Sequence, residues 1–120
     1  MRLIMLNLGV DIVAIDRIQS ILSSDKGLRF MKKIFSDQEI AESENKGDKS
    51  QYFSGRFAAK EAIKKALSSY DMSANHTFKS IQILNSSSGK PYVLSHSNQD
   101  INISISHDGN YAVAFCVIDK

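Results

Sequence analysis

The stretch from Phe53 to Ala66 reads FSGRFAAKEAIKKA. It is the centre of the longest helix that the sequence predicts, from about Ser50 to Ser69. At about 100° per residue, three basic and two aromatic side chains share nearly one sector of this helix: Arg56, Lys60, Lys64, Phe53 and Phe57. A surface helix separates such residues into a wet face and a dry face. The mixture therefore predicts a helix that lines a cleft or an interface, where lysine stems pack and their charged ends reach an anion.

Glu61, in the middle of this helix, has two interpretations. It lies four residues before Lys65, and an ion pair at this spacing is common on helices and stabilises them by only a few tenths of a kcal/mol. Glu61 could instead be a metal ligand among phosphate-binding lysines. Spacing alone favours the ion pair.

The rest of the chain predicts an α+β fold in a single domain over residues 1–120. Before the long helix, a strand of alternating aliphatics from Leu6 to Ile12 places Asp11 on its opposite face. Helices are expected from about Asp16, which is an acceptable N-cap, at Phe30–Ile34, and after Ser36, whose spacing to a glutamate fits a capping box. Four strands should follow at 80–84, 91–94, 101–106 and 111–118, the last two joined by a hairpin turn at Asp108-Gly109. Helices thus dominate the first half and antiparallel strands the second.

Composition excludes several classes of protein. The net charge is only +2, which argues against a protein that coats nucleic acid. Charge is nevertheless segregated along the chain. Residues 16–34 contain five bases and two acids (+3), residues 36–48 contain one base and five acids (−4), and residues 54–67 contain four bases and one acid (+3). This pattern fits an anionic partner or simply solvated helix faces. No stretch resembles a membrane span or a signal peptide, and Cys116 is the only cysteine, so we expect a cytoplasmic protein in which Cys116 is a small core residue.

Four blocks of sequence, in order, resemble the signatures of the holo-[acyl-carrier-protein] synthases, the short bacterial branch of the 4′-phosphopantetheinyl transferases. They are Gly9-Val10-Asp11-Ile12 with Arg17-Ile18, the long-helix stretch 53–66, Gly89-Lys90-Pro91-Tyr92, and Ile103 to His107 followed by Tyr111 to Ala114. The block Phe57 to Ala62 is specific, whereas Gly-Lys-Pro and Ser-His are weak taken singly. Together the blocks span almost the whole chain.

The resemblance implies that the chain moves the phosphopantetheine of coenzyme A to a serine of apo acyl carrier protein, in support of fatty acid biosynthesis. Adenosine 3′,5′-bisphosphate would be released. Asp11 and Glu61 are then the expected Mg²⁺ ligands, and Lys65 is expected near the transferring phosphate. These three residues are the candidate catalytic group. The candidate coenzyme A contacts are Arg56, Lys60, Lys65, Gly89, Lys90, Pro91 and His107.

The identity of the general base stays open between Glu61 and His107, with a binding role favoured for His107 because it continues the parity of the preceding isoleucines. His76 and His96 lie in polar loops and are expected to have no catalytic role. The acidic carrier protein should meet a basic surface: Arg17, Arg29, Lys32 and Lys33.

The resemblance also implies a homotrimer with active sites between subunits. Two alternatives remain at this point: a related transferase with a broad range of carrier proteins, and a non-enzymatic basic binding module.

Overall fold

The computed structural model describes residues 6–68, 77–94 and 100–119, and it confirms the α+β class. Its elements in chain order are β1 (Leu6–Ala14), α1 (Ile15–Ser23), α2 (Gly27–Ile34), α3 (Asp37–Ser43), α4 (Lys49–Ser68), β2 (Gln82–Asn85), β3 (Pro91–Leu94), β4 (Asp100–Asp108) and β5 (Tyr111–Asp119). In the described part of the chain, no helix is both long enough and apolar enough to cross a membrane.

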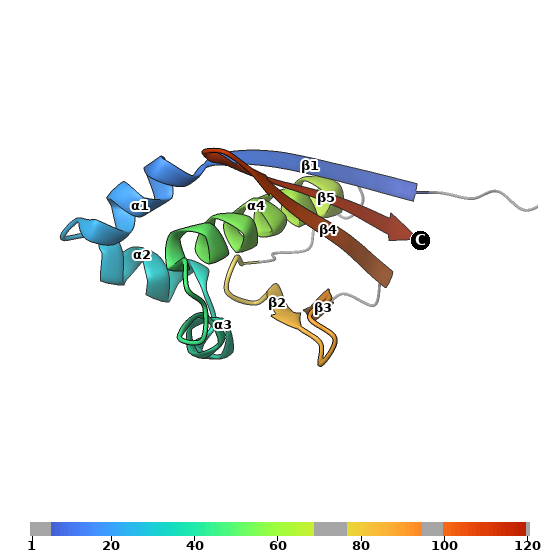
Figure 1. Ribbon diagram of the computed structural model, residues 1–120. Helices are drawn as coiled ribbons and strands as arrows, with labels where there is room; N and C mark the ends of the chain where they lie inside the picture. The colour runs from blue at the N-terminus through green and yellow to red at the C-terminus, as the bar shows by residue number, and fades with distance from the viewer. Residues whose placement is uncertain (1–5, 69–76, 95–99, 120) are drawn as a thin grey trace, which may run out of the picture.

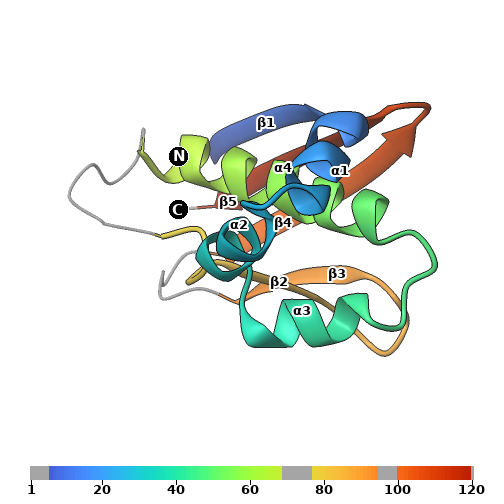
Figure 2. The same ribbon diagram turned by 90° about the vertical axis from the view of Figure 1, so that its left-hand side faces the viewer.

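Helix α4 is the centre of the molecule. An antiparallel sheet of order β1-β5-β4 covers one side of it, and α2, α3 and the separate β2–β3 hairpin lie on the other side (Figures 1 and 2). Every residue of α4 from Tyr52 to Lys60 is buried. The absence of an amphipathic pattern in α4 thus has a simple cause: protein packs against it from both sides.

The aliphatic face of β1 points away from α4. Leu6, Leu8, Val10 and Ile12 are between 50% and 63% exposed, although the predicted alternation itself is confirmed. The opposite face contacts the helix at Gly9, where a β-carbon would lie only 1.9 Å from the carbonyl oxygen of Ala62. The missing side chain of Gly9 thus lets β1 lie close against α4, and the four aliphatics are left outside.

Three local predictions differ from the structure. Helix α2 begins at Gly27 rather than near Phe30. Helix α1 begins near Asp16 as expected, but its N-cap is Ala14, and its first N–H groups are capped from the β4–β5 turn: Ile15 N and Asp16 N donate to the Asn110 main-chain and side-chain oxygens at 2.7 and 3.0 Å. The turn itself consists of Gly109 and Asn110 rather than Asp108 and Gly109. Gly109 has φ +57°, which suits the first position of a type II′ hairpin turn.

Other predictions are confirmed. Ser36 and Glu39 form the complete capping box at the start of α3, with both reciprocal hydrogen bonds present. Cys116 is fully buried in the core, and burial raises the pKa of its thiol to about 11.

Candidate active site

Asp11 and Glu61, fifty positions apart in the sequence, both act on the Lys65 ammonium, Asp11 through a hydrogen bond and Glu61 through its charge. Asp11 lies on the face of β1 that is turned toward α4, and its Oδ1 accepts a hydrogen bond of 2.9 Å from Lys65 Nζ. The ammonium also donates to the Val10 carbonyl oxygen at 3.2 Å. Glu61 lies one turn before Lys65 on α4. The close approach of β1 to α4 is what allows this cluster to form.

The electrostatics of the cluster follow from its two carboxylates. The hydrogen bond and the charge of Asp11 raise the pKa of Lys65, and the charge of Glu61 raises it further. The Lys65 side chain is 55% exposed and that of Asp11 is 17% exposed, so an anionic ligand has access to the ammonium. The cluster therefore offers two hard oxygen ligands and one cation at the surface.

This donor set fits Mg²⁺. The ion usually binds proteins through one or two carboxylates and completes its shell with water and substrate phosphates. Among the described residues, no group of three or more His, Cys, Asp and Glu side chains is placed to hold a metal ion. The assignment of Asp11 and Glu61 as Mg²⁺ ligands stays a prediction.

Lys60 and Arg56 do not line an open cleft as the helical pattern predicted. The Lys60 side chain is completely buried, and its ammonium donates three hydrogen bonds of 2.7 Å, to Glu39 Oε1 and to the carbonyl oxygens of Phe78 and Ile81. Burial lowers the pKa of Lys60, and the Glu39 carboxylate opposes this effect. With no exposed surface, Lys60 belongs to the core, which corrects its assignment as a coenzyme A contact.

Arg56 is almost as deeply buried as Lys60, but one of its N–H donors is not hydrogen-bonded to any described residue. Its side chain is 8% exposed, and Nη2 donates to Glu42 Oε1 at 3.1 Å and to Asn85 Oδ1 at 2.7 Å. The guanidinium also stacks on the Tyr52 ring, 4.4 Å from its centroid. Its Nε is buried and has no hydrogen-bond partner among the described residues. Arg56 is thus held mainly by protein groups.

His107 lies beside the N-terminal half of α4, next to Gln51 and Gly55. It shares the face of β4 with Ile105, as its parity predicted, and both would contact a β-carbon at Gly55. His107 Nε2 lies 3.1 Å from the Gln51 carbonyl oxygen. Because a carbonyl only accepts, Nε2 must carry the hydrogen of this bond, which leaves Nδ1 to face other partners. Glycine at position 55 is what lets the histidine ring approach α4 so closely.

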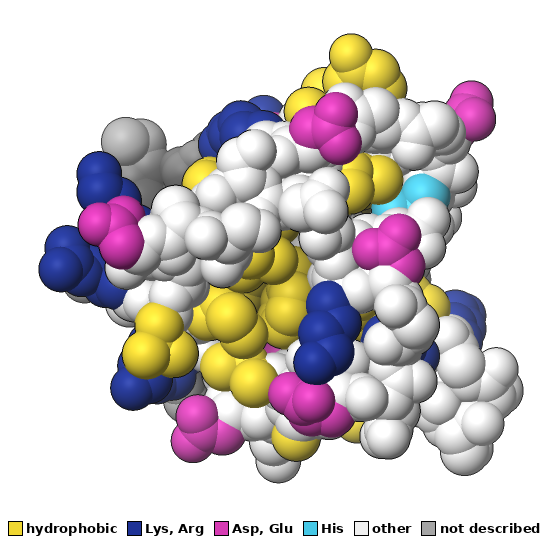
Figure 3. All heavy atoms as spheres, turned by 60° about the vertical axis from the view of Figure 1, so that its left-hand side comes forward, with side chains coloured by type: hydrophobic (Ala, Val, Ile, Leu, Met, Phe, Trp, Pro, Cys, Tyr) yellow, Lys and Arg dark blue, Asp and Glu magenta, His cyan; other side chains and the backbone are white. Residues whose placement is uncertain are grey.

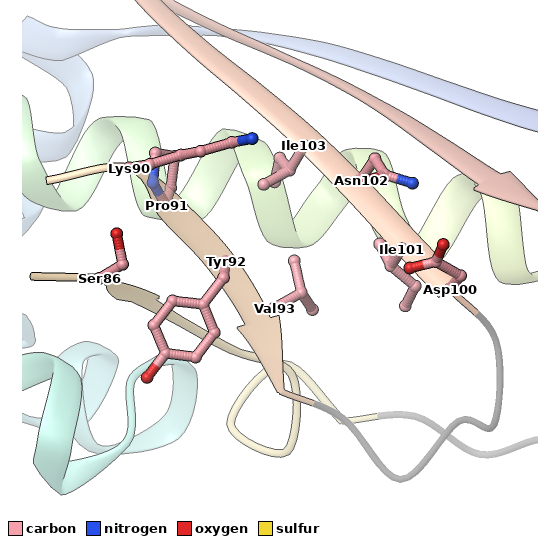
Figure 4. A pocket seen from close by; sticks show the side chains of 9 residues that line it. All are labelled: Ser86, Lys90, Pro91, Tyr92, Val93, Asp100, Ile101, Asn102 and Ile103. Carbon is pink, nitrogen blue, oxygen red and sulfur yellow. The ribbon is translucent and has the colours of Figure 1, made fainter. Parts of the chain in front are cut away.

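The block of residues 89–92, the third that resembles the family, forms one wall of a pocket. Lys90 and Pro91, together with Ser86, line a cavity of about 420 Å³ between the β2–β3 hairpin and β4. Figure 4 shows the Lys90 side chain reaching across the opening toward Ile103. Gly89 lies in the preceding turn with φ +87°, a conformation that favours glycine. The hairpin and the main sheet are separate sheets in the described chain, so the pocket lies between two strand edges.

Six further lining residues were not among the predicted site residues, although Tyr92 and Ile103 belong to the matched blocks. They are Tyr92, Val93, Asp100, Ile101, Asn102 and Ile103. The alternation of isoleucines marked one face of β4 but could not show that the edge of this strand borders a cavity.

The four predicted carrier-protein residues are all exposed, Arg17 on α1 and Arg29, Lys32 and Lys33 on α2. The side of the molecule that comes forward in Figure 3 is hollowed, with hydrophobic side chains at the bottom and charged side chains around it. A second pocket, of about 300 Å³, is lined from α1, α2 and the α3–α4 junction and includes Leu22, Met31 and Phe53. His76 and His96 lie outside the described residues.

Comparisons with known proteins cover nearly the whole chain. The sequence profile of the 4′-phosphopantetheinyl transferase superfamily matches residues 7–116. The holo-[acyl-carrier-protein] synthase of Thermodesulfovibrio yellowstonii is 43% identical over 111 residues, which are 92% of this chain and 95% of that protein. The synthase of Chlorobaculum tepidum is 44% identical over 119 residues, or 95% of this chain and 98% of that protein.

Solved structures agree. A holo-(acyl-carrier-protein) synthase from Bacillus anthracis in complex with CoA (3′,5′-ADP) superimposes with a TM-score of 0.82 at 28% identity, covering 98% of each chain. The Helicobacter pylori enzyme in complex with coenzyme A gives a TM-score of 0.78 at 31% identity, covering 92% of this chain and 98% of that one. A non-enzymatic binding module is therefore the wrong alternative. The chain belongs to the 4′-phosphopantetheinyl transferase superfamily and, within it, to the holo-[acyl-carrier-protein] synthases.

Proposed function

We propose that this chain transfers the 4′-phosphopantetheine of coenzyme A to a serine of apo acyl carrier protein, with Mg²⁺, in the cytoplasm and in support of fatty acid biosynthesis. The observation that carries the proposal is the cluster of Asp11, Glu61 and Lys65 at the β1–α4 contact, in a chain of this family. The family supplies the type of reaction, and the cluster supplies groups suited to it.

In the proposed reaction the serine oxygen attacks the β-phosphorus of coenzyme A. A phosphodiester bond to phosphopantetheine forms, the bond from this phosphorus to the bridging oxygen breaks, and adenosine 3′,5′-bisphosphate leaves with that oxygen. Asp11 and Glu61 would hold Mg²⁺, which supplies charge neutralisation at the pyrophosphate. Phosphoryl transfer depends mainly on positioning and charge stabilisation, so the Lys65 ammonium would bind the phosphate oxygens on which charge develops.

The serine proton needs an acceptor, for which we propose Glu61. It lies within the cluster, whereas the His107 ring is anchored through Nε2 to the Gln51 carbonyl oxygen and is better suited to contact the bound nucleotide. Lys90, Pro91 and Gly89 would bind the adenosine end of coenzyme A at the pocket between β3 and β4, with Arg56 contributing to its phosphates.

We further propose that the chain acts as a homotrimer and that the basic residues of α1 and α2 receive the acidic carrier protein. The uncovered aliphatic face of β1 supports association, since a row of half-exposed leucine, valine and isoleucine side chains is costly in water. Phe115 and Tyr111 of β5, 43% and 53% exposed, extend this apolar surface to the neighbouring strand.

Product analysis tests the proposal. Coenzyme A, Mg²⁺ and apo acyl carrier protein are incubated with the protein, and adenosine 3′,5′-bisphosphate is quantified by chromatography. Release is expected only with all components, and not with a carrier protein whose acceptor serine is alanine. Equal release from the alanine carrier would mean that coenzyme A is simply hydrolysed, and no release would contradict the transfer.

A further inference from the structure

The outer edge of β2 is covered by a helix rather than by a strand. Glu39 Oε2 accepts a hydrogen bond of 2.9 Å from Ile83 N, and Glu42 Oε2 accepts one of 2.9 Å from Asn85 N. Alternate residues of an antiparallel strand bond to opposite edges. These two N–H groups therefore point away from β3, and two carboxylates of α3 take the place of a neighbouring strand.

The other oxygen of each carboxylate binds a cation of α4. Glu39 Oε1 pairs with Lys60 at 2.7 Å, and Glu42 Oε1 pairs with Arg56 at 3.1 Å. The two acids are three residues apart on α3 and the two bases four apart on α4, so each pair lies on one face of its helix. We call these two acids, with their bonds to α4 and β2, the carboxylate bridge.

The bridge connects the hairpin to the body of the protein. Arg56 adds a direct bond of 2.7 Å to Asn85 Oδ1. Directly after Asn85 comes the turn closed by the bond of 2.9 Å from Ser86 N to the Lys90 oxygen. The position of Lys90 thus depends on how firmly Asn85 is held.

The same connection sets the width of the pocket. One wall is the hairpin, and the other is β4, which is fixed in the main sheet by its pairing with β5. Strand pairing does not join the two walls in the described chain. Core packing of Ile83 and Val93 and side-chain bonds such as those of the bridge therefore hold the hairpin at its distance from β4.

We propose that Glu42 is a positioning residue for coenzyme A: it keeps the hairpin and the Arg56 guanidinium in place without touching the reacting atoms. This inference rests on the proposed function. Glu42 is the informative member of the bridge because its side chain is 21% exposed. Glu39 is completely buried and also caps α3, so its replacement would disturb the whole fold.

The test is Glu42→Gln. This change keeps the shape of the side chain but removes the negative charge that binds both Arg56 Nη2 and Asn85 N. We expect KM for coenzyme A to rise about tenfold while kcat at saturating coenzyme A stays within about twofold of wild type, as for a loss of ground-state positioning. Calorimetric titration with coenzyme A alone should show a similar loss of affinity.

Two controls separate positioning from stability. Glu44→Gln removes the same charge from a residue whose partner is the exposed Lys49, at 3.0 Å, and should leave KM unchanged. Tyr52→Phe removes the hydroxyl bonds of 2.7 Å to the same Glu42 oxygen and 3.1 Å to the Glu39 carbonyl oxygen, but it leaves the Arg56 and Asn85 contacts in place. It should lower the thermal midpoint without raising KM.

Several results would overturn the inference. They are an unchanged KM in Glu42→Gln, an equal rise in Tyr52→Phe, or a loss confined to kcat. If Glu42→Gln does not fold, Asn85→Ala removes the Arg56 bond alone and must raise KM, or the inference fails. A wild-type protein that leaves the apo carrier unmodified would refute the proposed function instead, whereas normal turnover with an unchanged variant KM would refute this inference alone.

Discussion

Lys60 and Lys65 lie five positions apart on α4, yet their environments differ completely. The first is buried with three protein partners, and the second is 55% exposed beside Asp11. Helical spacing could not distinguish them, because the partner that neutralises Lys60 lies 21 positions away on α3. The resemblance identified the candidate cluster, and the fold decides which lysine can meet a ligand.

Replacing Lys60 by methionine should destabilise the protein by about 3–5 kcal/mol, because Glu39 would be left as an uncompensated buried charge. Urea unfolding measures the change. The control Lys49→Met disturbs only an exposed ion pair and should alter the free energy of unfolding by less than about 0.5 kcal/mol. Similar values for the two variants would contradict a buried structural role for Lys60.

Asp11→Asn should reduce kcat/KM for coenzyme A by about 100-fold or more, a loss of about 2.7 kcal/mol in transition-state stabilisation. The fold should survive, since the bond to Lys65 is partly exposed and such pairs stabilise little. Steady-state kinetics with circular dichroism checks both points, with Asp37→Asn, an exposed residue of α3, as the control. A folded variant with wild-type kcat/KM would remove Asp11 from the site.

At the scale of elements, the sequence predicts each helix and strand of the described chain, because hydrophobic periodicity and the capping box are local signals. The errors arise where distant residues decide. The start of α1 is fixed by Asn110, 94 positions further along, and the hairpin register depends on how β4 pairs with β5. No local pattern contains this information.

The contact between β1 and α4 can be tested at Gly9. Glycine to alanine would place a β-carbon 1.9 Å from the Ala62 oxygen, so the strand must move away from the helix. We expect a loss of about 1–3 kcal/mol in the free energy of unfolding. Because Asp11 is two residues along the same strand, activity should fall by more than the unfolded fraction explains.

Gly47→Ala is the control for this change, since no atom lies within 4 Å of a β-carbon there. Thermal unfolding and specific activity of both variants are compared with wild type. If Gly9→Ala keeps both wild-type values, the close contact does not shape the site.

At the scale of the whole molecule, the apolar face of β1 is the feature that a single subunit leaves unexplained. The sequence marked four aliphatics on one face of this strand, but it could not show whether that face is turned inward. The answer depends on Gly9 of the opposite face, whose missing side chain lets that face pack against α4 and leaves the four aliphatics outside.

Leu8→Glu should dissociate the proposed trimer, because it places a charge in the middle of the apolar face, where Leu8 is 59% exposed. Sedimentation equilibrium gives the mass of the species in solution. Leu28→Glu adds the same charge at a leucine of α2 that is 66% exposed and should leave the mass unchanged. A monomeric wild type with full activity would contradict an active site between subunits.

Phosphopantetheine transfer is measured most directly by the intact mass of apo acyl carrier protein after incubation with this protein, coenzyme A and Mg²⁺. We expect a shift by one phosphopantetheine, which a metal chelator abolishes and which Asp11→Asn slows by about the factor expected from its kcat/KM. An unshifted mass with several carrier proteins, or an equal shift with the chelator present, would contradict the proposed transfer with Mg²⁺.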